Sequence, residues 1–110
     1  MDTNNNYKII FTQTAEAELD GIYDYISKTL LSENSAKKLM EKIEEKTLRL
    51  EVFPESCSIA NGYIINDIQY RKLIVDNYIL LYHIDENNKQ VNIIHVFYGR
   101  RNYLKDIEIN

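Results

Sequence analysis

The chain has 110 residues, 45% of them hydrophobic and 27% charged, which is enough to bury one compact core and too little for two. We therefore expect a single domain over residues 1–110. The net charge of −4 argues against the strongly basic balance of most nucleic-acid-binding domains, and the single cysteine excludes an internal disulfide.

The first segment, residues 1–6, is polar and acidic, so it lacks the basic and then apolar pattern of a secretory signal. No apolar run approaches the roughly 20 residues that a membrane-spanning helix requires. We expect a flexible start, a cytoplasmic location and no membrane contact. Cys57 has no Cys or His cluster around it, so neither a metal site nor a cofactor is expected.

A first strand is predicted at residues 7–11, which are β-prone and bounded by polar side chains. An amphipathic helix over residues 15–26 follows, because apolar side chains recur there at steps of three and four. Thr14 is its predicted N-cap, and acids gather toward its N-terminus, where the helix macrodipole favours them. Gly21 costs this helix roughly 1 kcal/mol relative to alanine and would permit close approach of a neighbour.

A second amphipathic helix is predicted to open at Ser32, to keep its apolar stripe through Phe53 and to end at Pro54. Only a few residues separate the two helices, so an antiparallel hairpin is expected, with its apolar seams facing each other and the sheet. Residues 55–66 are rich in turn-forming side chains and are predicted as a connecting loop, with an irregular extended piece at 62–65.

Three runs rich in Ile, Val, Tyr and Phe follow at residues 70–75, 78–84 and 91–98. Short clusters of Asp and Asn separate them, which predicts an antiparallel meander. The fold class is therefore α+β, in the order β-α-α-β-β-β, with the helix hairpin on one face of a small antiparallel sheet. Both sides of the run 78–84 are apolar, so a partner protein is expected on the second face. Residues 104–110 form a short tail that frays or adds a helical turn.

Positive charge is concentrated on the predicted meander. Residues 1–69 hold 7 basic and 12 acidic side chains, whereas residues 70–105 hold 6 basic and 3 acidic ones. Three of the four arginines, Arg71, Arg100 and Arg101, lie at the starts or ends of these strands. Such a cluster indicates a site for phosphate or carboxylate. The alternative is that these arginines are solvated or paired with nearby acids.

Three stretches carry a family resemblance. They are the strand-to-helix opening at residues 9–22, the paired central strands at 70–84, and the last strand at 93–102, which closes on Gly99, Arg100 and Arg101. In their order and spacing they resemble the RelE/ParE superfamily of toxins from type II toxin–antitoxin modules, and the first stretch is closer to the ParE branch.

The resemblance implies the RelE/ParE fold and a growth-inhibiting toxin, of the kind linked to plasmid stabilization, that a cognate antitoxin neutralises. ParE-like members poison DNA gyrase, whereas RelE-like members cleave mRNA on the ribosome without a metal ion. Whether the chain is an enzyme is left open by this resemblance, and a homodimer is a further option.

RelE-like enzymes carry basic residues at alternate positions of the strand that begins at residue 70. Arg71 matches the first of these positions, but the second falls on Leu73, and Ile79 stands where those enzymes have an arginine. Arg101 matches the arginine after the last strand, and Tyr103 is near the place of their late tyrosine. Two expected cations are therefore missing, which weakens the nuclease interpretation.

His83 and His95 have the ordinary pKa of an acid or base and are conditional catalytic candidates, together with Arg71, Arg101 and Tyr103. The structural alternative, which we favour, is that each histidine is a face or edge residue with a satisfied hydrogen bond.

The sequence thus favours a ParE-like toxin that acts on gyrase. Its target-binding surface is predicted to comprise Arg71, Lys72, Arg100, Arg101 and Tyr103, and an antitoxin segment to occupy the second sheet face and the groove beside the helix hairpin. The alternatives are a ribosome-dependent mRNA endoribonuclease, which would use Arg71 and Arg101 for phosphate, and a non-toxic binding module.

Overall fold

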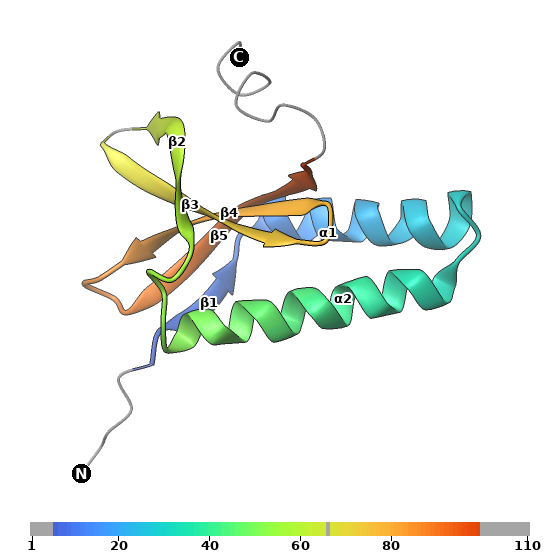
Figure 1. Cartoon of the computed structure of the whole chain (residues 1–110), viewed down its shortest axis with the longest axis horizontal. Helices are drawn as coiled ribbons and strands as arrows, with labels where there is room; N and C mark the ends of the chain where they lie inside the picture. The colour runs from blue at the N-terminus through green and yellow to red at the C-terminus, as the bar shows by residue number, and fades with distance from the viewer. Residues whose placement is uncertain (1–5, 66, 100–110) are drawn as a thin grey trace.

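The computed structural model describes residues 6–65 and 67–99, which form two helices packed on a five-stranded sheet (Figure 1). The elements in chain order are β1 (Lys8–Phe11), α1 (Gln13–Asp24), the π-helical turn η1 (Tyr25–Thr29), α2 (Glu33–Leu48), the 3-10 turn η2 (Arg49–Glu51), β2 (Ser58–Ile65), β3 (Ile68–Val75), β4 (Tyr78–Asp85) and β5 (Gln90–Tyr98). The predicted two-helix hairpin on one face of a small sheet is confirmed. None of the helices in the described part is long and apolar enough to cross a membrane.

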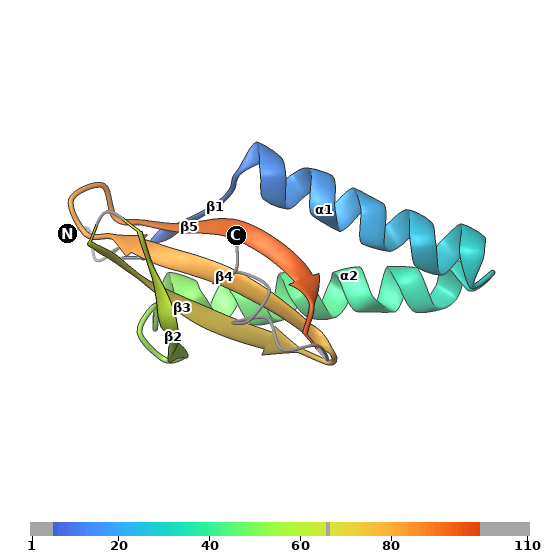
Figure 2. The same cartoon turned by 90° about the horizontal axis from the view of Figure 1, so that it is seen from above.

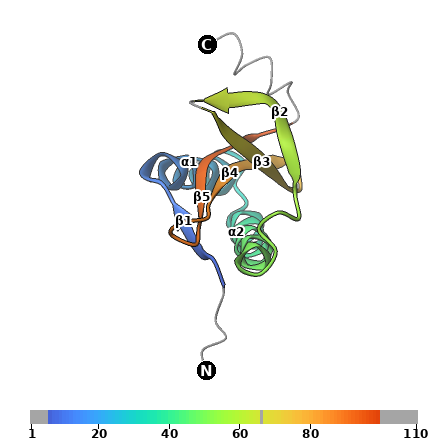
Figure 3. The same cartoon turned by 90° about the vertical axis from the view of Figure 1, so that its left-hand side faces the viewer.

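The sheet has the strand order β1-β5-β4-β3-β2. The antiparallel meander β3-β4-β5 is confirmed. Two details of the predicted sheet are wrong. The first strand pairs with β5 in parallel, and the predicted loop 55–66 contains β2, which pairs with β3 at the far edge (Figure 3). The pairing of β2 is interrupted between Ile59 and Ile64, so it lacks the regular alternation by which a strand is recognised from sequence.

Both helices begin at a side-chain cap. Ser32 caps α2 as predicted, because its Oγ accepts a hydrogen bond from the N–H of Ser35. The N-cap of α1 is Thr12 and not the predicted Thr14: Thr12 Oγ1 accepts from the N–H of Ala15 at 3.1 Å. Thr12 directly follows β1 and still has extended backbone, which is the conformation an N-cap needs.

The second helix ends earlier than predicted. Helical hydrogen bonding changes to a 3-10 turn after Leu48, and this turn directs Leu50 into the core. Phe53, predicted to continue the apolar stripe, is instead 66% exposed. Because a 3-10 turn advances by three residues per turn, it shifts the apolar stripe out of the α-helical register from which Phe53 was predicted.

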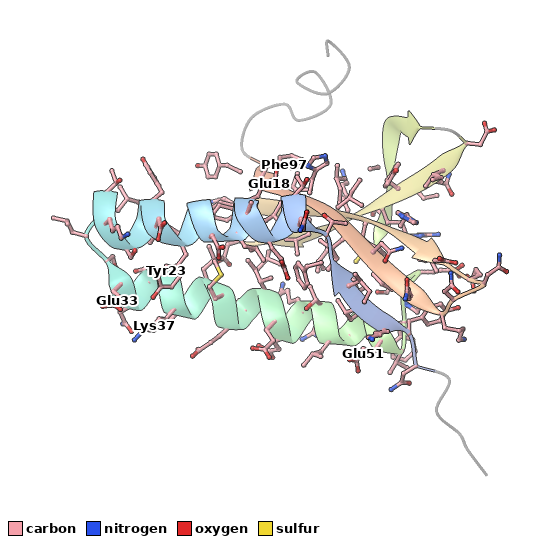
Figure 4. The ribbon with its side chains drawn as sticks, turned by 180° about the vertical axis from the view of Figure 1, so that it is seen from behind. Glu18, Tyr23, Glu33, Lys37, Glu51 and Phe97 are labelled. Carbon is pink, nitrogen blue, oxygen red and sulfur yellow. The ribbon has the colours of Figure 1, made fainter. Side chains whose placement is uncertain are left out.

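The helix hairpin covers one face of the sheet and fills the main core. Two fully buried alanines, Ala15 of α1 and Ala36 of α2, belong to this core, and Tyr23 of α1 packs against it (Figure 4). From the sheet, the largest fully buried side chains of this core are Tyr82, Leu80, Ile93, Val75, Val91 and Val96. A β-bulge in β5 opposite Leu81 and Tyr82 changes its alternation, so that Ile93 and Val96 both join this core.

The second face of the sheet has its own small cluster of buried residues, Ala60, Tyr70, Ile79 and Leu81. The register of β3 and β4 places these side chains opposite those of the main core. The prediction that both sides of the central strand are apolar is therefore confirmed.

Beyond the end of β1, side chains at the start of α1 and within it form hydrogen bonds with the edge of β5. Strand β1 pairs with β5 only as far as Ile93. Beyond that point Thr12 donates its hydroxyl to the carbonyl of Ile94, and Glu18 Oε1 accepts the N–H of Val96 at 2.7 Å. Figure 4 shows Glu18 beside the neighbouring residue Phe97. A carboxylate thus occupies the place that a carbonyl of a further strand would take.

Replacing Glu18 with Ala is expected to lower the free energy of unfolding by about 1 kcal/mol, because the partly buried N–H of Val96 loses its charged acceptor. The control is Glu16→Ala on the exposed side of α1, which should change stability by less than about 0.5 kcal/mol. Urea unfolding followed by circular dichroism measures both values. Equal midpoints for the two variants would contradict the assigned role of Glu18.

Candidate functional site

The two described basic residues of the predicted target surface, Arg71 and Lys72, are neighbours on β3 that point to opposite faces of the sheet. Arg71 is paired with Tyr82, whose side chain belongs to the main core, whereas Lys72 is paired with Leu81, which belongs to the second face. Lys72 therefore shares the second face with Tyr70, and Arg71 does not. Among the described residues, the structure does not bring these two cations together on one surface.

The guanidinium of Arg71 binds the chain's own backbone. Its Nη1 donates to the carbonyl of Cys57 at 2.7 Å and to that of Glu55 at 3.4 Å. Next to it, the fully buried Tyr82 donates its hydroxyl to the carbonyl of Pro54 at 2.7 Å. Burial and the nearby Cys57 raise the pKa of Tyr82 far above its ordinary value. The positive charge of Arg71 lowers this pKa, but by less than the other two effects raise it. Arg71 and Tyr82 together fix the segment between α2 and β2.

At two positions RelE-like enzymes carry basic residues and this chain has apolar ones, and both of these apolar side chains are buried. Leu73 lies in the main core, and Ile79 lies in the cluster on the second face. Gly99 packs directly on Ile79, since a Cβ at Gly99 would stand 2.6 Å from two atoms of that side chain. Arg100, Arg101 and Tyr103 lie outside the described residues, so their place in a target surface stays a prediction.

The two histidines have separate surroundings. The ring of His83 meets that of Tyr70 edge to face, with centroids 5.6 Å apart, on the second face. His95 Nδ1 lies 3.2 Å from Glu18 Oε2 of α1. They stand at different registers of the adjoining strands β4 and β5, His83 opposite Asn92 and His95 opposite Leu81. No group of three or more His, Cys, Asp and Glu residues in the described part could hold a metal ion.

A groove of about 700 Å³ runs between α1 and the ends of β4 and β5. Its lining includes Gly21, Ile22 and Tyr25 from the helix side and Tyr78 and Tyr98 from the sheet. The rings of Tyr78 and Tyr98 meet edge to face at 5.5 Å. Burial raises the pKa of Tyr78, and the neighbouring hydroxyls of Tyr98 and Tyr25 raise it further, so three tyrosines gather here. An apolar wall with phenol groups suits an amphipathic protein segment.

The groove is open at Gly21. A Cβ built on Gly21 would meet nothing within 4 Å, so neither packing nor backbone conformation within the described chain requires a glycine there. A glycine in the middle of a helix costs about 1 kcal/mol relative to alanine. No neighbour within the described chain makes the close approach predicted at Gly21, and the helix backbone there is accessible from the groove.

The tip of the helix hairpin extends past the end of the sheet (Figures 1 and 2). Leu30 lines the groove, and the adjacent Leu31 is 84% exposed with a φ of 54°, in the left-handed region that leucine rarely adopts. The chain reaches this turn through the π-helical turn η1, a form frequent at functional sites. Exposed leucines on a strained turn are typical of a contact surface.

Several of these contacts were missed by sequence reasoning. The acids near the start of α1 were given only a role with the helix macrodipole, whereas Glu18 binds the backbone of β5. Arg71 was assigned to a site for phosphate or carboxylate, whereas its guanidinium binds backbone carbonyls. The only local signal for the groove was Gly21, which interrupts an otherwise good helix. Its sheet wall comes from Tyr78 and residues 96–98, which lie 57 to 77 positions after Gly21, and only the observed sheet order brings them to α1.

Comparison with known proteins identifies the family. The family model described as the ParE toxin of type II toxin–antitoxin systems, parDE, matches residues 9–103. No match was found among curated proteins.

Three solved structures share the fold at low sequence identity. A chain of the chromosomal ParDE toxin–antitoxin system from P. aeruginosa superposes with a TM-score of 0.68 at 19% identity, covering 87% of this chain and 99% of that one. A chain of the RelE–RelB complex from Pyrococcus horikoshii gives 0.61 at 14% identity, with 87% and 98% covered. A chain of the RelBE2 toxin–antitoxin complex from Mycobacterium tuberculosis gives 0.55 at 20%, with 84% and 98% covered. Since the family model spans most of the sequence, the chain belongs to the ParE toxin family of type II toxin–antitoxin systems, within the RelE/ParE superfamily.

Proposed function

We propose that this toxin inhibits growth by acting on DNA gyrase and is neutralised by a cognate antitoxin. The observation that carries the choice of target is the burial of Leu73 and Ile79. At these two positions the resemblance to RelE-like nucleases expects cations, and buried apolar side chains cannot hold a phosphate or stabilise charge in a transition state. Arg71, the remaining match on these strands, already binds two backbone carbonyls.

In this proposal the antitoxin occupies the groove between α1 and β5. Three features support it: the apolar lining, the open space at Gly21 and the exposed leucines at the hairpin tip. The ParDE, RelE–RelB and RelBE2 structures with the same fold are described as toxin–antitoxin systems or complexes. The target surface consists of Lys72 and the predicted Arg100, Arg101 and Tyr103. Arg71 contributes by holding the segment that follows α2.

One observation favours the second candidate, a ribosome-dependent mRNA endoribonuclease. Tyr70, Lys72 and His83 share the second face of the sheet, where Tyr70 and His83 are in ring contact. An imidazole could take the proton of an RNA 2′-hydroxyl while a nearby cation stabilises the phosphate. This set is smaller than the metal-free reaction needs, which is why gyrase is preferred.

Expression from a tightly controlled promoter is expected to stop growth, to induce the DNA-damage response and to leave mRNA intact. The readouts are colony counts, a damage-response reporter and mapping of mRNA ends. Codon-phased cuts in mRNA without a damage response would indicate the ribosome and not gyrase as the target. Normal growth would contradict the proposal that the chain is a toxin.

Replacing both Arg100 and Arg101 with Ala is expected to abolish this growth arrest, because the proposed target surface loses two guanidinium groups. The matched control is Arg49→Ala, which removes an exposed arginine from η2 and should leave toxicity unchanged. Circular dichroism establishes that each variant is folded. Full toxicity in the folded double variant would remove these residues from the target surface.

Filling the groove from Gly21 is expected to weaken antitoxin binding without unfolding the toxin. Gly21→Phe places a ring in the open space and should raise the Kd for the antitoxin about tenfold or more, which corresponds to about 1.4 kcal/mol. Gly21→Ala should preserve binding and raise helix stability by up to about 1 kcal/mol. Calorimetric titration with the purified antitoxin measures the affinity.

The matched control for bulk is Glu16→Phe, which adds the same ring to the exposed side of α1, away from the groove. Equal antitoxin affinity for the Gly21→Phe and Glu16→Phe variants would place the antitoxin elsewhere on the toxin.

A further inference from the structure

A second exposed apolar surface lies at the other end of α2 from the groove. Val52 and Phe53, which follow the turn η2, are 55% and 66% exposed, although the next residue, Pro54, is buried. Two consecutive large apolar side chains left in solvent forgo the stabilisation that burial would provide. Such exposure is typical of an interaction surface rather than of a connecting segment.

The backbone of this segment is held firmly. Tyr82 and Arg71 bind three of its carbonyls, those of Pro54, Glu55 and Cys57, from the core side. The segment also closes its own turn, because the N–H of Ser56 donates to the carbonyl of Phe53 at 3.1 Å. Val52 and Phe53 are therefore exposed on an ordered scaffold and not on a frayed loop. An ordered scaffold lowers the entropy cost of binding.

These two side chains form one wall of a pocket of about 510 Å³, which is completed by Tyr7, Pro54, Glu55, Ser56 and Glu86. The hydroxyl of Tyr7 donates to Glu86 Oε1 at 2.5 Å. That hydrogen bond raises the pKa of Tyr7, and the charges of Glu86 and Glu55 raise it further, so both carboxylates lie near this phenol. Within residues 6–65 and 67–99, neither Glu55 nor Glu86 forms an ion pair with Lys or Arg.

The pocket therefore combines aromatic rings, an aliphatic wall and two carboxylates without a cationic partner. The ring of Tyr7 is already covered by Lys89, whose Nζ lies 4.1 Å from its centroid, so the exposed ring of Phe53 is the aromatic surface left for a further cation. Guanidinium groups stack on aromatic faces and bind carboxylates through a planar fork of donors. An arginine is the side chain that uses all these features at once, with its aliphatic stem along Val52 and Phe53.

From this geometry we infer that Tyr7, residues 52–56 and Glu86 form a docking site for a protein segment that presents an arginine beside a bulky apolar residue. Charge complementarity selects this partner. A two-fold contact of this surface with the same surface of a second copy would bring like carboxylates together and be repelled, and an acidic segment would be repelled for the same reason. The site lies at the opposite end of α2 from the antitoxin groove, so the two surfaces can be occupied together.

The test is a titration of the full-length, isotope-labelled chain with the capped tripeptide Arg-Leu-Arg, followed by amide chemical shifts. Saturable shifts are expected at the amides of Tyr7, Val52, Phe53, Glu55, Ser56 and Glu86, and binding should weaken as salt is added. The tripeptide Glu-Leu-Glu should cause no saturable shift. No saturable shift with Arg-Leu-Arg, or equal shifts with both peptides, would overturn the inference.

Two variants separate docking from stability. Phe53→Ser together with Glu55→Gln changes only exposed side chains and should weaken Arg-Leu-Arg binding about tenfold or more in a chain that stays folded. The control Ile74→Thr removes a comparably exposed apolar side chain from β3, outside the pocket, and should leave binding unchanged. Equal affinity in the Phe53 and Ile74 variants would refute the site.

Discussion

The structure depends on one constraint: the central strand β4 must be buried on both faces, although the helix hairpin covers only one. Leu80 and Tyr82 point into the core beneath the helices, and Ile79 and Leu81 point to the opposite side, where they are also buried. Burial on both faces is usual for parallel sheets sandwiched between helices and unusual for an antiparallel meander. The chain therefore keeps a second, smaller apolar cluster on a face that no helix covers within the described residues.

Local signals were enough to predict most of the fold. Ser32 caps its helix through a contact three residues away, and the meander follows from β-prone runs separated by short turns, so both are encoded in nearby sequence. The failures have non-local causes. Strand β2 pairs irregularly around a bulge, and β1 finds a parallel partner some 80 residues further along the chain. No local pattern specifies either pairing.

The candidate site was harder to predict because strand register decides the role of each side chain. Arg71 and Lys72 read as one basic pair in sequence, yet period-two alternation sends them to opposite faces. Arg71 then meets carbonyls that belong to a segment 14 to 16 residues earlier, and its charge serves the scaffold. Phe53 shows the converse error: helical periodicity predicted it to be buried, and a single 3-10 turn exposes it.

The carboxylate of Glu18 on the rim of β5 has a further consequence for a protein of this kind. An open strand edge is a template on which another chain can build, and such edges lead to aggregation when a protein accumulates. Because Thr12 at the start of α1 supplies a hydroxyl to the carbonyl of Ile94 and Glu18 supplies a carboxylate to the N–H of Val96, these two groups of the rim already have partners past Ile93. The same helix that helps to form the core thus keeps these two backbone groups from pairing with a strand of another copy.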